Sequence, residues 1–326
     1  MNAIHRRRLL IASAALAAGS AARANPAATR PDRVATIVVP YPPGGSTDIL
    51  ARSLQGQPAG WGGQTVVLDY KPGAGGLIGA AFVARSPADS HRVLLATQPI
   101  LSITPHMNVS MGFDPLKDLV PLTNGVNAVL GVAVHPALPV SNLAELAAYS
   151  RRNPGTVSFG SAGVGSPQHV GGVLLGQRAG IDWRHVGYKG GAPMNADLLA
   201  GHIQAGIATM SIFKPYIADR RLKVLAVGEP RRYAGTPDIP TMAETVPGFE
   251  LSTWLAFFGA SSMPADQIAW YSQALRETLN TPEVVARMSE SGLIIDAQGP
   301  EHLARMVSRD YELYGKVIRD NGITNG

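Results

Sequence analysis

Short apolar runs rich in β-branched residues alternate along the chain with longer segments whose apolar residues recur every three or four positions. The first kind predicts buried strands, such as 36–39 and 156–159, and the second predicts helices, such as 167–179. Such alternation is typical of mostly parallel sheets with helices on both faces. The remaining predicted elements are strands over 65–68, 93–96, 119–122, 129–134, 185–188, 203–207, 223–227 and 253–259, and helices over 47–54, 78–85, 141–153, 193–200, 264–279, 282–291 and 301–318.

Two loops rich in glycine and proline each run from a predicted strand into a predicted helix. The first spans 40–48 and the second spans 159–167. Ser46 or Thr47 is a suitable N-cap residue for the first helix, and Ser166 for the second. Backbone amides at a helix start, flanked by small residues that admit a close approach, form an anion site. The pair of loops therefore predicts two lobes that hold one small anion.

The candidate ligand-binding residues follow from this placement, because open α/β sheets bind ligands at the carboxyl ends of their strands. We expect Asp48 to order the loop amides rather than neutralise an anion, with contact to a ligand hydroxyl or a water as the alternative. His169 is either a neutral donor to a carboxylate or a packed histidine. The full set comprises Tyr41, Gly44, Gly45, Ser46, Thr47 and Asp48 in the first loop, Thr97 and Gln98 after the third strand, and Ser161, Ala162, Gly163, Ser166 and His169 in the second loop.

The first 24 residues have the features of an export signal. Arg6, Arg7 and Arg8 precede an apolar stretch over 9–18, and Ala22-Arg23-Ala24 is a cleavage signal that places the mature start at Asn25. The arginines fit either a twin-arginine leader or an ordinary Sec leader. No later stretch is long and apolar enough for a membrane span, so we expect a protein of the periplasm.

Composition narrows the possible partners. The chain has 326 residues, 28 basic and 23 acidic, and loss of the four leader arginines leaves a net charge of +1. This balance gives no support for nucleic acid binding. The chain has no cysteine, which excludes disulfides and a thiol nucleophile. Its length suggests two domains.

Enzyme motifs are missing. No serine lies in a G-x-S-x-G sequence, and the glycines at 73 and 75 lack the third glycine of a dinucleotide fingerprint. The eight histidines form no H-E-x-x-H motif, so no metal or other cofactor is expected. A secreted α/β hydrolase or isomerase remains the alternative from another functional class.

Several motifs in a fixed order resemble the Bug family, also called TctC-like, the extracytoplasmic solute receptors of tripartite tricarboxylate transporters. Besides the two loops, they are Lys71-Pro72-Gly73-Ala74-Gly75-Gly76, Phe113-Asp114-Pro115-Leu116-Lys117-Asp118, Asn153-Pro154-Gly155, Tyr188-Lys189-Gly190-Gly191-Ala192-Pro193 and Pro237-Asp238-Ile239-Pro240-Thr241 with Glu244. The chain departs from the family pattern at Ser90-His91-Arg92-Val93 and at Val186-Gly187-Tyr188.

The resemblance implies a two-lobed periplasmic binding protein of the Venus-flytrap type, with mostly parallel sheets flanked by helices. Lobe one would comprise 25–127 and 248–326, and lobe two would comprise 128–247. It implies a monomeric, non-enzymatic receptor that passes a small organic carboxylate to membrane subunits of a tripartite tricarboxylate transporter. A receptor that reports to a signalling system is the alternative within this class.

Overall fold

The computed structural model describes residues 33–88 and 91–324. The predicted leader over 1–24 and the mature start at Asn25 lie outside the described residues. The strands form one sheet in the order β2-β1-β3-β9-β4-β7-β5-β6, and β10 and β8 also pair with β4. Their bounds are β1 Thr36–Val39, β2 Val67–Tyr70, β3 Arg92–Thr97, β4 Leu119–Val134, β5 Ser158–Ser161, β6 Arg184–Gly187, β7 Ala205–Thr209, β8 Lys223–Val227, β9 Ser252–Ala260 and β10 Leu293–Ile295.

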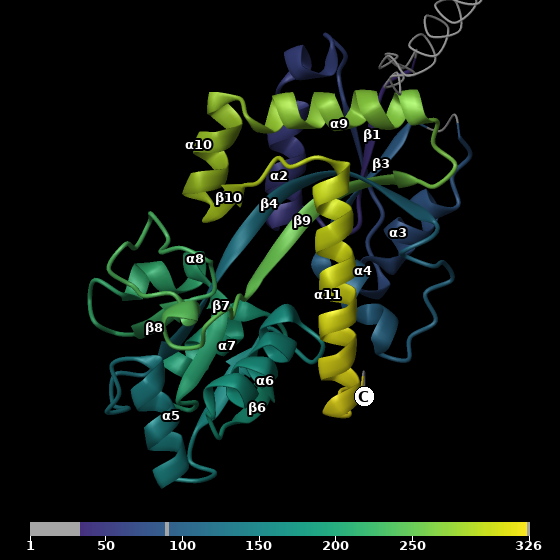
Figure 1. Ribbon diagram of the computed structural model, residues 1–326. Helices are drawn as coiled ribbons and strands as arrows, with labels where there is room; N and C mark the ends of the chain where they lie inside the picture. Colours follow the sequence, from purple (N-terminus) through teal and green to yellow (C-terminus); the bar gives the residue numbers. More distant parts are fainter. Residues whose placement is uncertain (1–32, 89–90, 325–326) are drawn as a thin grey trace, which may run out of the picture.

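Strand β4 passes through both halves of the molecule (Figure 1). The two strands predicted over 119–122 and 129–134 are therefore wrong as separate elements. The polar residues between them do not break the strand, because the Asp296 carboxylate accepts hydrogen bonds from the Asn124 and Asn127 side chains at 2.7 and 3.2 Å. Two irregularities in the pairing with β9 accommodate this stretch.

The sheet is mixed. Strand β1 pairs in parallel with β2 and β3, and β5 pairs in parallel with β6 and β7, as expected. Every pair that includes β4 or β9 is antiparallel, so the expectation of mostly parallel sheets is wrong for the centre of the sheet. The reason is that β4 and β9 run past each other in opposite directions between the halves (Figure 1).

The helices cover the sheet close to their predicted positions. Helices α4 and α8 and strand β10 were not predicted, because each is five residues or fewer and lacks a periodic pattern. The helix bounds are α2 Ser46–Gln55, α3 Leu77–Ala84, α4 Gln98–Ser102, α5 Leu143–Arg152, α6 Pro167–Ala179, α7 Gly191–Leu199, α8 Met210–Phe213, α9 Ala265–Leu279, α10 Pro282–Glu290 and α11 Pro300–Asp320.

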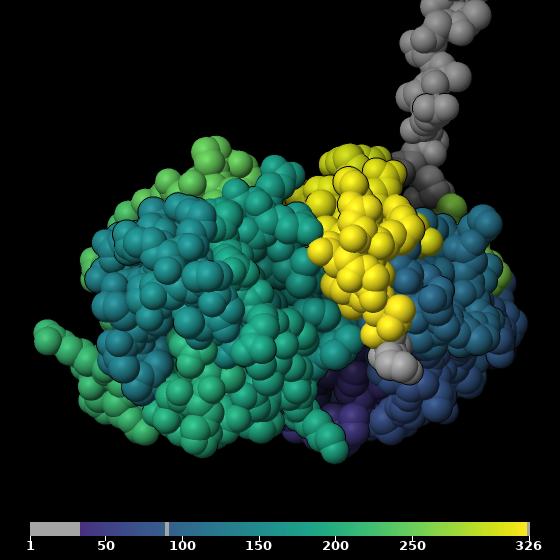
Figure 2. Space-filling model, turned by 90° about the horizontal axis from the view of Figure 1, so that it is seen from below, coloured from purple at the N-terminus to yellow at the C-terminus, as the bar shows by residue number. Residues whose placement is uncertain are grey.

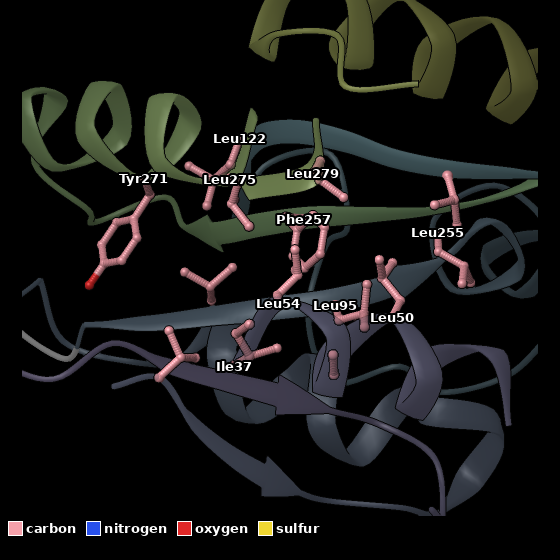
Figure 3. Close-up of a cluster of buried hydrophobic side chains, with 14 of the residues drawn as sticks. Ile37, Leu50, Leu54, Leu95, Leu122, Leu255, Phe257, Tyr271, Leu275 and Leu279 are labelled. Carbon is pink, nitrogen blue, oxygen red and sulfur yellow. The ribbon is translucent and has the colours of Figure 1, made fainter. Parts of the chain in front are cut away.

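The hydrophobic core is divided between the two halves. Two clusters of buried side chains draw only on residues 35–128 and 254–307, and two others draw only on residues 129–251. Figure 3 shows part of the first cluster, in which Phe257 of β9 lies among Leu54, Leu275 and Leu279. Each half therefore has apolar packing of its own, as two-lobed α/β proteins do.

Helix α11 joins the halves on one side. Its Tyr314, Val317 and Ile318 form a fifth cluster with Val170 of α6 and with Met107. Figure 2 shows α11 in yellow along the seam between the teal half and the blue part of the other half. Beside its end, the purple N-terminal residues lie deep in a hollow.

Candidate functional site

A cavity of about 930 Å³ lies between the halves. One wall comes from the loop before α2, the turn at Ala74 and Gly75, and the segment after β3. The opposite wall comes from the loop before α6 and from the residues after β7, and the back of the cavity is made by parts of β4, β9 and β10. The two predicted loops therefore face one cavity.

Eight of the candidate residues line this cavity, and five lie outside the lining. The lining residues are Tyr41, Gly45, Ser46, Thr47, Thr97, Ala162, Gly163 and Ser166. The other five form hydrogen bonds within the two loops or with buried residues behind the cavity. They are Gly44, Asp48, Gln98, Ser161 and His169.

Helix α2 begins one residue earlier than the sequence predicted. Its N-cap residue is Gly45, which has no side-chain cap, so the predicted N-cap at Ser46 or Thr47 is wrong. The first intrahelical bond runs from the Ile49 amide to the Gly45 carbonyl, which leaves the amides of Ser46, Thr47 and Asp48 without an intrahelical acceptor. Gly45 offers these amides no side-chain acceptor, and Ser46 and Thr47 line the cavity.

Asp48 lies outside the cavity lining and holds the first loop by hydrogen bonds. Its carboxylate accepts from the Gly44 amide at 2.9 Å and from Arg52 Nε at 2.8 Å, and also from the Tyr70 hydroxyl. Burial raises the pKa of Asp48, but these three hydrogen bonds outweigh it and bring the pKa below its usual value. The carboxylate is thus ionised and fully engaged, which matches the expectation that it orders the loop.

Tyr41 and Thr97 connect the first loop to its neighbours. The Tyr41 hydroxyl donates to the Gly75 carbonyl at 2.9 Å and lies 2.8 Å from the Thr97 hydroxyl. Burial raises the pKa of Tyr41, so it remains a neutral phenol. The pair fixes the turn at Ala74 and Gly75 against the end of β3.

Gln98, the residue after Thr97, points away from the cavity. Its Nε2 donates to the Asp310 carboxylate of α11 at 2.7 Å, and the Trp254 indole donates to the same oxygen at 2.9 Å. Asp310 is only 2% exposed, so these are buried, charge-assisted bonds. Gln98 therefore connects the site to α11.

The second loop is held mainly by its own hydrogen bonds. Ser166 is the N-cap of α6, as predicted, and accepts from the His169 amide at 3.2 Å. The Gly163 amide donates to Ser161 Oγ at 3.1 Å, and the Gly165 amide donates to His169 Nδ1 at 3.1 Å. These two amides already have acceptors, and Pro167 has no N–H. The Gln168 amide is therefore the donor at this helix start that has no intrahelical acceptor.

Beneath this loop, His169 stacks on His185 with 3.6 Å between ring centroids and 17° between planes. Burial lowers the pKa of His169 to about 4, and burial together with repulsion from the neighbouring imidazole lowers the pKa of His185 to about 4 as well. His185 Nε2 lies 2.7 Å from the Ser161 hydroxyl. Both rings are neutral at pH 7 and support the loop, which matches the packed alternative for His169.

Sequence reasoning missed several lining residues. Gln168, whose amide has no intrahelical acceptor, directly follows the predicted loop. Thr209 ends β7 and Ser211 follows it, so the rule on strand ends would have found them had the strand not been predicted two residues early. Thr253 and Leu293 carry no sequence signal, because only the crossing of the central strands brings them to the cavity.

The cavity wall carries no charge at neutral pH. Its described residues include no aspartate, glutamate, lysine, arginine or histidine. The polar groups are hydroxyls, backbone amides and the Gln168 carboxamide, and the starts of α2 and α6 supply the positive ends of two helix dipoles. Such a site favours an anion without an ion pair.

The described part of the chain holds neither a metal-binding cluster nor a helix that could cross a membrane. Residues 33–88 and 91–324 hold no group of three or more histidine, aspartate or glutamate side chains suited to a metal ion. None of the helices in these ranges is long and apolar enough to span a bilayer.

Comparison with known proteins identifies the family. Residues 50–323 match TctC, the tripartite tricarboxylate transporter family receptor. Protein BugT of Bordetella pertussis is 31% identical over 316 residues, which are 96% of this chain and 95% of BugT.

Solved structures agree with this assignment. The periplasmic binding protein BugD superposes with a TM-score of 0.70 at 29% identity, over 90% of this chain and 99% of BugD. Rpa4515 of R. palustris, solved with adipate, superposes with a TM-score of 0.75 at 29% identity, over 91% of this chain and 99% of Rpa4515. The resemblance seen in the sequence is confirmed: this chain has the two-lobed α/β fold of periplasmic binding proteins and belongs to the TctC family of solute receptors.

Proposed function

We propose that this receptor closes on a small organic carboxylate and delivers it to membrane subunits of a tripartite tricarboxylate transporter. The observation that carries the proposal is the uncharged cavity between the halves, onto which two helix starts open. The adipate bound to Rpa4515 supports a carboxylate as the ligand. Binding would use amides and hydroxyls alone, without turnover and without a cofactor.

The carboxylate would lie at the start of α2. There the amides and hydroxyls of Ser46 and Thr47 can approach it from one lobe, and Gly45 leaves the space that it needs. Ser166, Ala162 and Gly163 would contact the ligand from the other lobe, and Tyr41 and Thr97 would line its sides. Gly44, Asp48, Ser161 and His169 would hold the two loops in place.

Lobe one would comprise 25–127 and 248–326, and lobe two would comprise 128–247. The division of the core lies a few residues from these boundaries, because Ala128 packs in a cluster of the first half and Phe249 and Leu251 pack in a cluster of the second half. Strand β4 changes partner at nearly the same point, since it leaves β9 after Val129 and pairs with β7 from Leu130. Closure would then bend the molecule near this change of partner. We further propose that the mature receptor is a monomer that begins at Asn25 after cleavage of a Sec or twin-arginine leader.

A thermal-shift screen of the purified mature protein tests the proposed function. Mono-, di- and tricarboxylates would be compared with neutral sugars and metal cations at equal concentration. A ligand at 100 times its Kd stabilises the folded state by about 2.7 kcal/mol, which such a screen detects. Stabilisation by one or more carboxylates is expected, whereas stabilisation by sugars or cations alone would refute the proposal.

A further inference from the structure

A second hollow lies on the outer side of lobe one, next to the ligand cavity. This groove has a volume of about 600 Å³ and is formed by α3, the start of β3 and the segment 109–111. We call it the α3 groove, and its defining residues are Ile78, Phe82, Arg85, Arg92, Val109 and Met111. It contains none of the candidate ligand-binding residues.

The α3 groove combines an apolar floor with cations. Ile78 is 53% exposed, which is unusual for a large aliphatic side chain. Lys71 Nζ and Arg92 Cζ lie 4.2 and 4.6 Å from the centroid of the Phe82 ring, so two cations make cation–π contacts with one ring. Arg85 lies at the rim and donates to the Gly112 carbonyl at 2.5 Å.

No carboxylate of the described residues neutralises the guanidinium groups of the groove. In the described part of the chain, neither Arg85 nor Arg92 has a carboxylate within 4.0 Å, whereas Lys71 pairs with Asp69 at 3.3 Å. The residues that line the groove include no aspartate or glutamate. An occupant that fits this surface therefore carries a carboxylate next to apolar side chains.

The groove and the ligand cavity share a wall. Ala74, Leu77 and Val109 line both of them. The wall includes the turn 73–76, in which all four residues have positive φ, Ala74 among them at 48°. A non-glycine residue in this region is strained, so the turn keeps its shape only through its contacts.

Those contacts come from both sides of the wall. On the groove side, Ile78 packs so closely over Gly73 that an added Cβ there would lie 2.5 Å from its Cδ1 atom. On the cavity side, the Tyr41 hydroxyl donates to the Gly75 carbonyl. A ligand against Tyr41 and an occupant against Ile78 thus act on the same turn.

We propose that the α3 groove docks an acidic, partly apolar segment of the membrane partner, and that the turn 73–76 couples this docking to the ligand cavity. The proposal rests on the proposed receptor function. Charge complementarity selects this occupant, since the groove offers two guanidinium groups that have no carboxylate partner among the described residues, around an exposed apolar floor.

Variants that place a glutamate in the groove of the full-length protein test the proposal. Arg85→Glu and Ile78→Glu change exposed side chains of the groove. Arg151→Glu is matched to the first, because Arg151 is also exposed and donates to a glycine carbonyl, that of Gly180. Val285→Glu is matched to the second, since Val285 is an aliphatic residue that is 41% exposed on α10.

Two measurements are made on each variant. The first is the Kd of the carboxylate from the screen, measured by calorimetry on purified protein. The second is uptake of the same labelled carboxylate by native-host cells whose chromosomal copy is deleted. We expect both groove variants to lose uptake about tenfold or more, while both controls keep uptake. Arg85→Glu should keep Kd within about twofold, whereas Ile78→Glu, which removes the contact over Gly73, should also weaken binding through the turn 73–76.

Each other outcome has a defined meaning. Full uptake by folded groove variants overturns the docking proposal. A wild-type receptor that binds the carboxylate but restores no uptake also overturns it, and leaves the binding function intact. Light scattering that shows a wild-type dimer and an Arg85→Glu monomer assigns the groove to a second copy of the chain instead. Failure of every carboxylate to bind removes the proposed function itself.

Discussion

Replacement of Gly45 by valine should abolish most ligand binding and leave the fold intact. Gly45 has φ −89° and ψ −179°, which any residue adopts, and a Cβ placed there meets no atom within 4 Å. The added side chain would occupy the part of the cavity beside the open amides of Ser46 and Thr47. The variant therefore separates binding from folding.

The magnitude follows from the contacts that the side chain would block. Hydrogen bonds to a charged group contribute about 1.5–3 kcal/mol each, and a helix N-terminus adds about 0.3–1 kcal/mol for an anion. Loss of about 3 kcal/mol, near the low end for two such bonds, raises Kd about a hundredfold.

The chain offers a matched control in Gly299. It is the N-cap of α11 with φ −74° and ψ −177°, has no side-chain cap, and has nothing within 4 Å of an added Cβ. Gly299→Val therefore reproduces the change at a helix start away from the cavity. Calorimetry on both variants, with circular dichroism to verify folding, gives the comparison. Equal affinity of the two variants would refute the assignment of the carboxylate to the start of α2.

Three further predictions concern stability. Gly228→Ala should destabilise the protein by about 3 kcal/mol or more in a denaturant melt, because the added Cβ would lie 1.8 Å from the Leu251 carbonyl oxygen. A variant that unfolds at the same denaturant concentration as the wild type would contradict this packing. Asp310→Ala should cost about 3 kcal/mol in the same assay, since two buried donors lose their acceptor, and a loss below about 0.5 kcal/mol would show that the network contributes little. His169 and His185 have pKa values of about 4 when folded against about 6.5 when unfolded, so the unfolded chain binds more protons between these values. Their contribution is therefore complete above about pH 6.5 and declines as the pH falls to 4, and thermal melts that show no decline over this range would contradict the burial of the pair.

The sequence predicted those parts of the fold that local patterns encode. The β-branched run at 36–39 and the periodic segment at 167–179 became β1 and α6 with the bounds expected, because both combine a clear hydrophobic pattern with a flanking turn or cap. The continuity of β4 could not be predicted, since Asp296, which accepts hydrogen bonds from its central asparagines, lies far away in the sequence.

In the candidate site, too, local patterns predicted some features, whereas features that depend on distant residues could not be predicted. The two loops were found because glycine, proline and hydroxyl residues at a strand end have a local meaning. The sequence could not show which amides were open, because that depends on the partners of Asp48 and His169. It also could not show that Gln98 turns toward Asp310, 212 positions away.

The central claim is that a carboxylate binds at the start of α2 in the cavity between the lobes. A crystal structure of the mature protein with the tightest-binding carboxylate of the screen tests it most directly. We predict carboxylate oxygens at about 3 Å from the Ser46 and Thr47 amides. A carboxylate bound away from these amides, or outside the cavity, would contradict the account.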